Sequence, residues 1–448
     1  MKREIRPVKR IGGVIRVPGD KSIAHRAALL SILCQSPLQV SNFPPGSDCR
    51  SSLDAARKLG VTVESGDNGA LTLSPPPQLA VPSETIIDCG NSGTTARLLA
   101  GLAAGSGVEL IISGDDSLSS RPMKRVVDPL TEMGAELFDT EGHLPLKING
   151  RKLLPFEYRL PVPSAQVKSS LLLAALASQC ALTLQEDLIT RDHTERMISE
   201  LGGGIDVREV KPVREEDPLD PRKKRMVMPE SFKKEIVLRS SSKLAGGTVD
   251  IPGDISTAAY FFAAAAVSGK TVTVEGVGLN STRTAILEHL KNIGCTVEIA
   301  DRERISGEPR GTVTVTGGEL KPRKISGEMS ARLIDELPVV AVIAAYSPGT
   351  TIIRDAAELK FKESDRLAAI ASNLEKMGVS CGVLEDGLVI ERKNAPNGAD
   401  FETFGDHRIA MAFSIAALFA VGPSTIDDDS VVAVSCPDFY QILGQIIQ

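Results

Sequence analysis

Six stretches of this chain share one pattern: a short polar segment, often rich in Gly or Ser, is followed by an apolar run of helical length. A helix that is apolar on every side must be buried, so the runs predict an interior built from helices. The free N–H groups at a helix start favour anions. Six such starts that converge would form an anion site. The polar segments are 21–26, 91–94, 164–166, 253–256, 335–338 and 406–408.

A second pattern alternates with the first: an amphipathic helix that ends at a Gly and is followed by a strand-like segment. In 364–378, for example, Leu367, Ile370 and Leu374 share one helix face, and Ser364 is placed to cap the helix. The Gly after each helix suits a left-handed C-terminal cap. The chain therefore predicts repeated units of one buried helix, one amphipathic helix and short strands, spaced by about 70 to 75 residues.

Three units fall on each side of a charge-dense insertion near 208–236, which we expect to be a solvated loop. The tripeptide Pro-Gly-Asp occurs at 18–20 and again at 252–254, at equivalent points of the two halves. We therefore predict an α/β protein of two similar domains with a cleft between them. One domain is expected to comprise residues 1–19 plus 248–448, and the other residues 20–247.

Composition narrows the class of partner. The net charge is −6, aromatic residues make up 4% and Trp is absent, so we expect neither nucleic acid nor a membrane surface as partner. The longest apolar runs are too short to cross a bilayer, and the basic N-terminus lacks the apolar core of a secretory signal. Seven scattered Cys without a C-x-x-C pair fit a reducing compartment. We expect a cytoplasmic monomer that uses no metal and no cofactor.

The first half offers cations and hydroxyls at predicted helix starts. Lys21, Ser22 and Arg26 would give a phosphate backbone donors, a hydroxyl and two positive charges. Gly93 permits close approach of a ligand to the backbone, and Arg121 can clamp a carboxylate or phosphate. Taken singly, each feature fits a capped helix or an exposed cation equally well. Further polar groups of this half are Ser164, Gln166 and Arg191.

The second half places acids among bases. Asp335 precedes a buried helix, Glu363 follows Lys362 and lies close to Arg366, and Arg408 starts the last apolar run. Acids near a helix start commonly complement the helix dipole, which is the simpler interpretation for each one alone. Recurrence at six related helix starts favours a common anion site instead.

The motifs KS-x-x-HR, GN-x-G-T, RPM, S-x-Q, IDE-x-P, KESDR and DHRIAM occur in this order, and from about Val14 to Phe439 the chain resembles the 5-enolpyruvylshikimate-3-phosphate (EPSP) synthase family. The resemblance implies two similar domains, each of three βαβαββ-type units around buried parallel helices, an inverse α/β barrel. It also implies transfer of the enolpyruvyl group of phosphoenolpyruvate to the 5-hydroxyl of shikimate 3-phosphate. Phosphate leaves through a tetrahedral adduct, and neither metal nor cofactor takes part.

The resemblance further implies residue roles. Asp335 resembles the base near the 5-hydroxyl, Glu363 the acid–base group at the enol carbon, and Lys21 the lysine shared by both substrates. The implied contacts to shikimate 3-phosphate are Lys21, Ser22, Arg26, Ser164, Ala165, Gln166, Arg191, Asp335 and Lys362. The implied contacts to phosphoenolpyruvate are Lys21, Gly93, Arg121, Gln166, Arg366 and Arg408. Because these residues come from both halves, we expect the domains to close on the substrates.

Two features leave alternatives open. Many family members carry a Lys within the stretch that corresponds to 432–437, and this chain has none there. The RDHTE stretch and the Val-Lys pair at 167–168 resemble the glyphosate-tolerant branch, yet Gly93 is not the Ala that can crowd that inhibitor.

A UDP-N-acetylglucosamine enolpyruvyl transferase would have Lys-Asn at 21–22 and a Cys near Arg121. A non-catalytic module that binds phosphorylated metabolites could lack the acids at 335 and 363.

Overall fold

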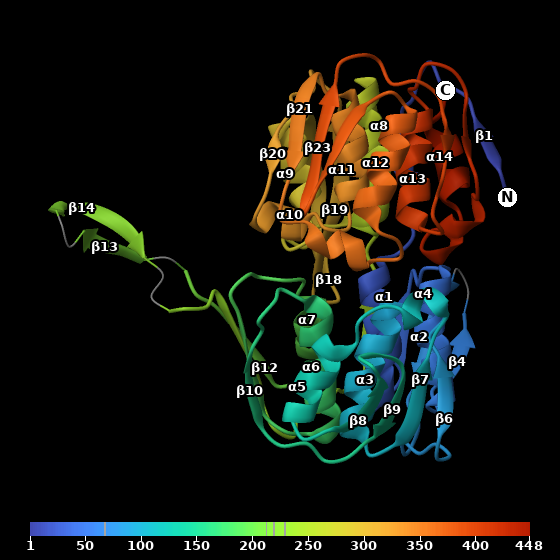
Figure 1. Cartoon of the computed structure of the whole chain (residues 1–448). Helices are drawn as coiled ribbons and strands as arrows, with labels where there is room; N and C mark the ends of the chain where they lie inside the picture. Colours follow the sequence, from blue (N-terminus) through green and yellow to red (C-terminus); the bar gives the residue numbers. More distant parts are fainter. Residues whose placement is uncertain (67–68, 212, 218–219, 228–229) are drawn as a thin grey trace.

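The computed structural model describes residues 1–66, 69–211, 213–217, 220–227 and 230–448. It forms two lobes, one above the other in Figure 1. The core of the first lobe draws on residues between Ile23 and Ile251. The core of the second lobe runs from Ile5 to Val17 and from Ile255 to Ile446. The predicted α/β architecture of two similar halves is thus confirmed.

Three helices at the centre of each lobe are buried on nearly every side, as the apolar runs predict. Small residues let two of them pack closely: a Cβ on Gly101 would lie 1.9 Å from the carbonyl oxygen of Ser170. No helix in the described ranges is long and apolar enough to span a membrane. The inner helices are α1 (Lys21–Leu30), α3 (Gly93–Ser106) and α6 (Ala165–Ser178) in the first lobe, and α8 (Ile255–Ser268), α11 (Leu337–Tyr346) and α13 (His407–Ala417) in the second.

The amphipathic helices form where the Gly-terminated pattern predicts them. In α12 the apolar face of Leu367, Ile370 and Leu374 is buried. The cap of this helix differs from the expectation, because Asp365 accepts the first N–H groups while the Ser364 hydroxyl donates to Asp406. These helices are α2 (Ser47–Lys58), α5 (Lys124–Glu132), α7 (His193–Glu200), α9 (Ala285–Asn292), α12 (Arg366–Lys376) and α14 (Phe439–Ile446); shorter ones are α4 (Asp116–Ser119) and α10 (Glu328–Arg332).

Apart from the two-stranded sheet of the insertion, the described part of each lobe has three sheets, and the four-stranded ones repeat one topology: a parallel pair extended by an antiparallel hairpin. The first lobe holds β16 (Gly247–Asp250)–β3 (Leu38–Ser41)–β5 (Leu71–Ser74)–β4 (Thr62–Ser65), β6 (Thr85–Asp88)–β7 (Glu109–Ser113)–β9 (His143–Asn149)–β8 (Glu136–Thr140), and β10 (Phe156–Arg159)–β11 (Leu182–Glu186)–β15 (Lys234–Leu238)–β12 (Ile205–Glu209). The second holds β18 (Thr296–Ile305)–β19 (Glu308–Thr316)–β17 (Thr271–Gly278)–β2 (Gly13–Arg16), β20 (Lys324–Ile325)–β21 (Gly349–Ile353)–β23 (Gly387–Arg392)–β22 (Ser380–Leu384), and the shorter β1 (Arg3–Ile5)–β25 (Ser424–Ile426)–β24 (Asp400–Phe401).

The two Pro-Gly-Asp tripeptides are the crossovers between the lobes. They run antiparallel, with the Asp20 N–H donating to the Pro252 carbonyl at 2.8 Å and the Asp254 N–H to the Pro18 carbonyl at 2.9 Å. Gly19 is required at this crossing, because a Cβ there would lie 2.0 Å from the Asn42 carbonyl oxygen. The expected limit at 248 needs correction: β16 pairs with β3, so the chain leaves the first lobe only after this strand.

The insertion near 208–236 differs from the expected loop. Its backbone forms strands β13 (Val213–Asp217) and β14 (Asp220–Val227), which pair antiparallel and project from the first lobe in Figure 1. The insertion thus lies between β12 and β15, two strands of one sheet. Within it, residues 212, 218–219 and 228–229 lie outside the described part of the chain.

Candidate active site

A cavity of about 280 Å³ lies between the lobes where the starts of the inner helices meet. Its walls come from α1, α3 and α6 on one side, and from the segments before α11, before α12 and at the start of α13 on the other. Twelve of the fourteen residues predicted for the site line it: Lys21, Ser22, Gly93, Arg121, Ser164, Ala165, Gln166, Arg191, Asp335, Lys362, Glu363 and Arg408.

The other two, Arg26 and Arg366, are buried behind the wall. The Arg26 guanidinium donates to the Thr194 hydroxyl at 2.6 Å, the Ser169 hydroxyl at 2.7 Å and the Ser22 carbonyl at 2.8 Å. Its three nitrogens therefore all have protein partners, and in this structure Arg26 supports the first turn of α1 rather than lining the cavity.

The first-lobe wall is held by hydrogen bonds between neighbouring helix starts. The Gln166 amide accepts from Arg97 at 2.8 Å and donates to the Thr94 hydroxyl at 2.9 Å, which fixes its orientation. Lys21 at the start of α1 forms an ion pair with Asp48 of α2. Burial disfavours the charge on Lys21, but Asp48 and then the acid at 363 raise the pKa of the ammonium above its usual value. A permanent cation thus lies at this wall.

Arg121 is oriented by the loop before α3. Its guanidinium donates to Asn91 Oδ1 at 2.5 Å and to the Ser117 hydroxyl at 3.0 Å. Its Nε is buried and has no partner among the described residues. A Cβ on Gly93 would lie 3.0 Å from Arg97 Nη1 and 3.4 Å from Arg121 Nη1, so a side chain at 93 would crowd the Arg97 guanidinium first.

Asp335 lies among four cations. Arg191 of the first lobe forms an ion pair with it, Lys362 Nζ lies 3.6 Å from its carboxylate, and Arg408 Nη2 and Arg366 Nη1 each lie 3.8 Å away. Burial alone would raise the pKa of Asp335, but these charges, led by that of Arg191, hold it well below its usual value. The carboxylate is therefore ionised and shielded by cations from both lobes.

Glu363 belongs to a second group of charges. Arg366 donates to Glu363 Oε2 at 2.5 Å and to Asp406 Oδ2 at 2.7 Å, so one guanidinium joins two carboxylates. Burial opposes ionisation of Glu363, but Arg366, then His407 and Arg121, hold its pKa well below the usual value. Without substrate the carboxyl is ionised, as its cationic neighbours in the sequence indicate.

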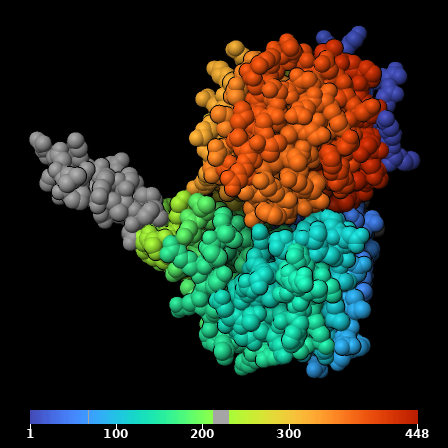
Figure 2. All heavy atoms as spheres, viewed as in Figure 1, coloured from blue at the N-terminus to red at the C-terminus, as the bar shows by residue number. Residues whose placement is uncertain are grey.

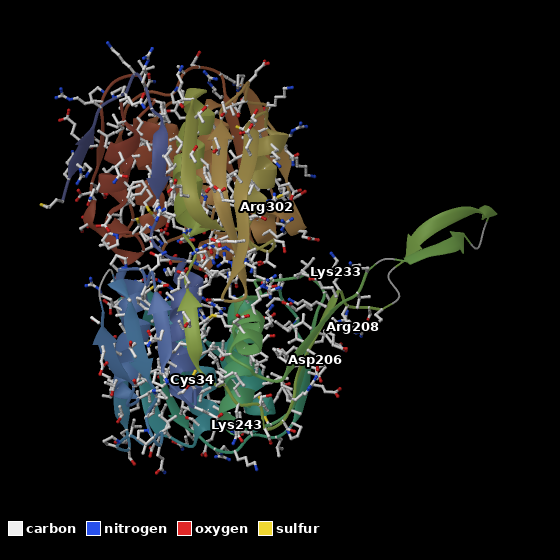
Figure 3. All side chains as sticks on the ribbon, turned by 180° about the vertical axis from the view of Figure 1, so that it is seen from behind. Cys34, Asp206, Arg208, Lys233, Lys243 and Arg302 are labelled. Atoms are coloured by element: carbon white, nitrogen blue, oxygen red, sulfur yellow. The ribbon has the colours of Figure 1, made fainter. Side chains whose placement is uncertain are left out.

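Direct contacts bridge the lobes beside the cavity, and Figure 2 shows the lobes as two masses that touch along this boundary. His193 Nδ1 lies 2.7 Å from Glu308 Oε1, and the Asn280 amide donates to Asp192 at 2.7 Å. At the edge of the boundary the Lys233 ammonium, labelled in Figure 3, lies 3.0 Å from Glu328. The lobes are thus in contact around the predicted residues.

Sequence reasoning missed several charged residues of the lining, among them Asp48, Arg97 and Arg283. Arg97 carries the one charge in the apolar run 93–106, a signal that could have revealed it. Asp48 and Arg283 lie in polar stretches without a comparable signal. Arg283 Nη2 donates to the Ser256 hydroxyl at 2.6 Å, and its Nη1 lies 3.4 Å from the Ser22 hydroxyl. Among the described residues no cluster of His, Cys, Asp and Glu could hold a metal ion.

Known proteins resemble this chain in both sequence and structure. The family model described as EPSP synthase (3-phosphoshikimate 1-carboxyvinyltransferase) matches residues 5–443. The chain belongs to the EPSP synthase family. Enzymes named 3-phosphoshikimate 1-carboxyvinyltransferase from Desulforamulus reducens and Herpetosiphon aurantiacus are each 40% identical to it, over 100% of this chain and 99 to 100% of theirs. The EPSP synthase of Acinetobacter baumannii superposes with a TM-score of 0.82 at 35% identity, covering 99% of this chain and 98% of that one.

Membership in the EPSP synthase family confirms the predicted activity. The chain is a transferase of the shikimate pathway that moves the enolpyruvyl group of phosphoenolpyruvate to shikimate 3-phosphate. The UDP-N-acetylglucosamine alternative is not favoured. The enolpyruvyl transferase NikO of Streptomyces tendae, at a TM-score of 0.74 and 17% identity, shares the fold.

Proposed function

We propose that the interlobe cavity is the active site of this transfer and that the cations and carboxylates at its walls carry it out. The observation that supports this most is the convergence, around one cavity of about 280 Å³, of cations from both lobes with two ionised carboxylates. Both substrates are small polyanions, and several Arg and Lys are needed to offset their charge and hold their geometry.

Shikimate 3-phosphate is assigned to the side where α1 and α6 begin. The starts of these helices supply N–H groups, hydroxyls at 22 and 164 and the oriented amide of Gln166. Arg191 and Lys362 would then meet the phosphate from opposite lobes. The proposed contacts are Lys21, Ser22, Arg26, Ser164, Ala165, Gln166, Arg191, Asp335 and Lys362. For Arg26 the role requires that it exchange a protein partner for the substrate.

Phosphoenolpyruvate is assigned to the side where α3 and α13 begin. Gly93 leaves open backbone there, and the fixed Arg121 guanidinium offers a bidentate contact. The proposed contacts are Lys21, Gly93, Arg121, Gln166, Arg366 and Arg408. Arg366 would act from behind the wall through its Nη1, which is buried without a hydrogen-bond partner among the described residues.

The two acids divide the proton transfers. Asp335 accepts the proton of the 5-hydroxyl as that oxygen attacks C2 of phosphoenolpyruvate, and C3 gains a proton delivered by Glu363. Loss of phosphate and of a C3 proton from the tetrahedral adduct then restores the double bond, with the proton returning to Glu363. Lys21 stays charged beside the leaving phosphate and stabilises it.

Substrate binding has to free both acids for these roles. With Arg191 paired to Asp335, the carboxylate is too weak a base, so Arg191 must move to the substrate phosphate. The pKa of Glu363 must rise from its low value in the free protein, and the negative charge of phosphoenolpyruvate beside it would raise it. We propose that the lobes tighten on the substrates as these exchanges occur.

The decisive assay follows phosphate release from phosphoenolpyruvate with shikimate 3-phosphate as acceptor and, separately, with UDP-N-acetylglucosamine. Release with shikimate 3-phosphate alone is expected. Release only with the sugar nucleotide, or with neither, would overturn the proposal.

We further propose that the protein acts as a cytoplasmic monomer whose domains are residues 1–19 plus 252–448 and 20–251. The separate cores of the two lobes support this division. Light scattering coupled to gel filtration tests the monomer, for which a single species near the chain mass of 47.6 kDa is expected. A stable species of twice that mass would contradict it.

A further inference from the structure

His25 lines the cavity, yet the proposed mechanism gives it no task. It lies on α1 one turn after Lys21, and helical side chains are directed towards the N-terminal end of their helix. The side chain is fully buried at 0% exposure. Its Nδ1 lies 2.8 Å from the Ser52 hydroxyl, whereas its Nε2 has no hydrogen-bond partner among the described residues. Buried polar groups of this kind are rare in native structures and need an explanation.

A chain of hydroxyls leads from His25 to the start of α3. Ser52 Oγ lies 2.7 Å from Thr95 Oγ1, which lies 2.7 Å from Ser92 Oγ. Ser92 caps α3 by accepting the Thr95 N–H and is itself fully buried. These hydrogen bonds therefore connect the starts of two inner helices, one on each proposed substrate side.

Only one direction of hydrogen bonding along these hydroxyls gives every hydroxyl proton an acceptor. If Ser92 donates to Thr95, Thr95 to Ser52 and Ser52 to the ring, all three protons are used. In the reverse direction the Ser92 proton would lack an acceptor within the described structure, at a cost of roughly 1–3 kcal/mol. The first direction makes Nδ1 of His25 an acceptor, and a neutral ring then carries its proton on Nε2.

The ring is also kept neutral. Burial, followed by the charges of Lys21 and Arg26, lowers the pKa of His25 well below its usual value, against a smaller opposing effect of Asp20. An uncharged imidazole thus lies among the cations of the cavity wall.

We propose that His25 binds substrate: its Nε2–H donates a hydrogen bond to a substrate oxygen beside Lys21 and Ser22, which belongs to shikimate 3-phosphate if the proposed function holds. A cation in this place would attract any anion. A neutral donor that is fixed in tautomer and direction binds only a ligand whose oxygen lies at the right position. The partner that Nε2 lacks in the free protein is then supplied by the ligand.

The direct test is ¹⁵N NMR of His25 in the full chain, identified by its loss in His25→Gln. Free protein should show the neutral Nε2–H tautomer, and saturating shikimate 3-phosphate should move the Nε2–H proton resonance downfield. An Nδ1–H tautomer, or an unmoved resonance while calorimetry shows the ligand bound, would overturn the proposal.

Two substitutions separate the donor from packing. In His25→Asn the side-chain oxygen can still accept from Ser52 but the cavity donor is lost, and we expect the Kd for shikimate 3-phosphate to rise about tenfold. In His25→Gln an amide N–H reaches the place of Nε2, and the Kd should stay within about threefold of the parent. His289→Asn removes a buried imidazole outside the cavity lining and should leave the Kd unchanged.

An unchanged Kd in His25→Asn would contradict the proposal, and so would equal weakening in the Asn and Gln variants when both unfold at the parent temperature. Should either variant fail to fold, the NMR result on the parent chain decides. Phosphate release by the parent chain tests the proposed function separately, so the two ideas can fail independently.

Discussion

The two lobes present the same helix geometry to the cavity but different chemistry. On the first lobe, α1, α3 and α6 are capped by Asp20, Ser92 and Ser164 and offer hydroxyls, an amide and cations. On the second lobe, α11 and α13 bring Asp335 and Arg408 to the same space, and Glu363 joins them from the segment before α12. The repeated unit thus provides an anion-binding frame, and a few side chains determine whether a wall binds substrate or transfers protons.

The lobes also use buried charge differently. In the first lobe, Lys168 is fully buried and contacts Glu186 at 3.0 Å and Glu195 at 2.8 Å, away from the cavity lining. In the second lobe, the buried Arg366 contacts an acid of the lining itself. We therefore expect loss of the Lys168 charge to affect stability, and loss of the acids at 335 and 363 to affect turnover.

The largest effect is expected from Asp335→Asn. Loss of the proposed base should lower kcat by about 10²- to 10⁴-fold, while KM for shikimate 3-phosphate changes less than about threefold. Steady-state phosphate release measures both, with the exposed Asp116→Asn as the matched control. A large rise in KM at normal kcat would limit Asp335 to substrate binding and remove the contrast between the lobes.

Lys168→Met tests the structural role of buried charge in the first lobe. Removing this cation leaves Glu186 and Glu195 buried without their shared partner, although Lys234 still lies 3.3 Å from Glu195, so the free energy of unfolding should fall by about 3–5 kcal/mol. Urea denaturation measures the loss. At a temperature where the variant is folded, kcat should remain within about threefold of the parent. A kcat loss as large as that of Asp335→Asn, without destabilisation, would contradict the division of roles.

Glu363→Gln sharpens the contrast within the second lobe. We expect kcat to fall about 10²-fold and one limb of the pH–rate profile to disappear, because the titrating acid is gone. The profile is measured at saturating substrates with the parent chain alongside. A profile of unchanged shape in the variant would show that Glu363 transfers no proton.

A smaller effect concerns acid stability, to which two buried histidines of the second lobe contribute. Burial lowers the pKa of His289 to about 4, and burial, followed by the Lys21 charge, lowers that of His407 to about 3. Because the unfolded chain binds these protons near pH 6.5, stability is complete above that value and is lost as the pH falls towards 4, by at most about 1.4 kcal/mol per unit and group. His289→Gln should reduce this slope in urea titrations at pH 7, 6 and 5. An unchanged slope would show that His289 is not neutral in the fold.

The repeated helices, the two halves and twelve residues of the lining could be predicted from sequence, because burial periodicity and helix starts are local signals. Contacts between separate helices could not be predicted in this way. The Lys21–Asp48 pair joins two helices, and Arg283 reaches Ser22 across the crossover, so neither leaves a mark in the local sequence. For Arg26 the sequence motif was evident, but the hydroxyls on α6 and α7 that accept its hydrogen bonds were not. The cap of α12 was missed because Ser364 and Asp365 are equally good capping types and only the backbone decides between them.

The account depends most on the exchange of partners at Asp335. A crystal structure with shikimate 3-phosphate bound tests it directly. We predict the ligand in the interlobe cavity, Arg191 on its phosphate and the Asp335 carboxylate turned to the 5-hydroxyl. A bound ligand with the Arg191–Asp335 pair intact and its 5-hydroxyl remote from Asp335, or a ligand outside the cavity, would contradict the account.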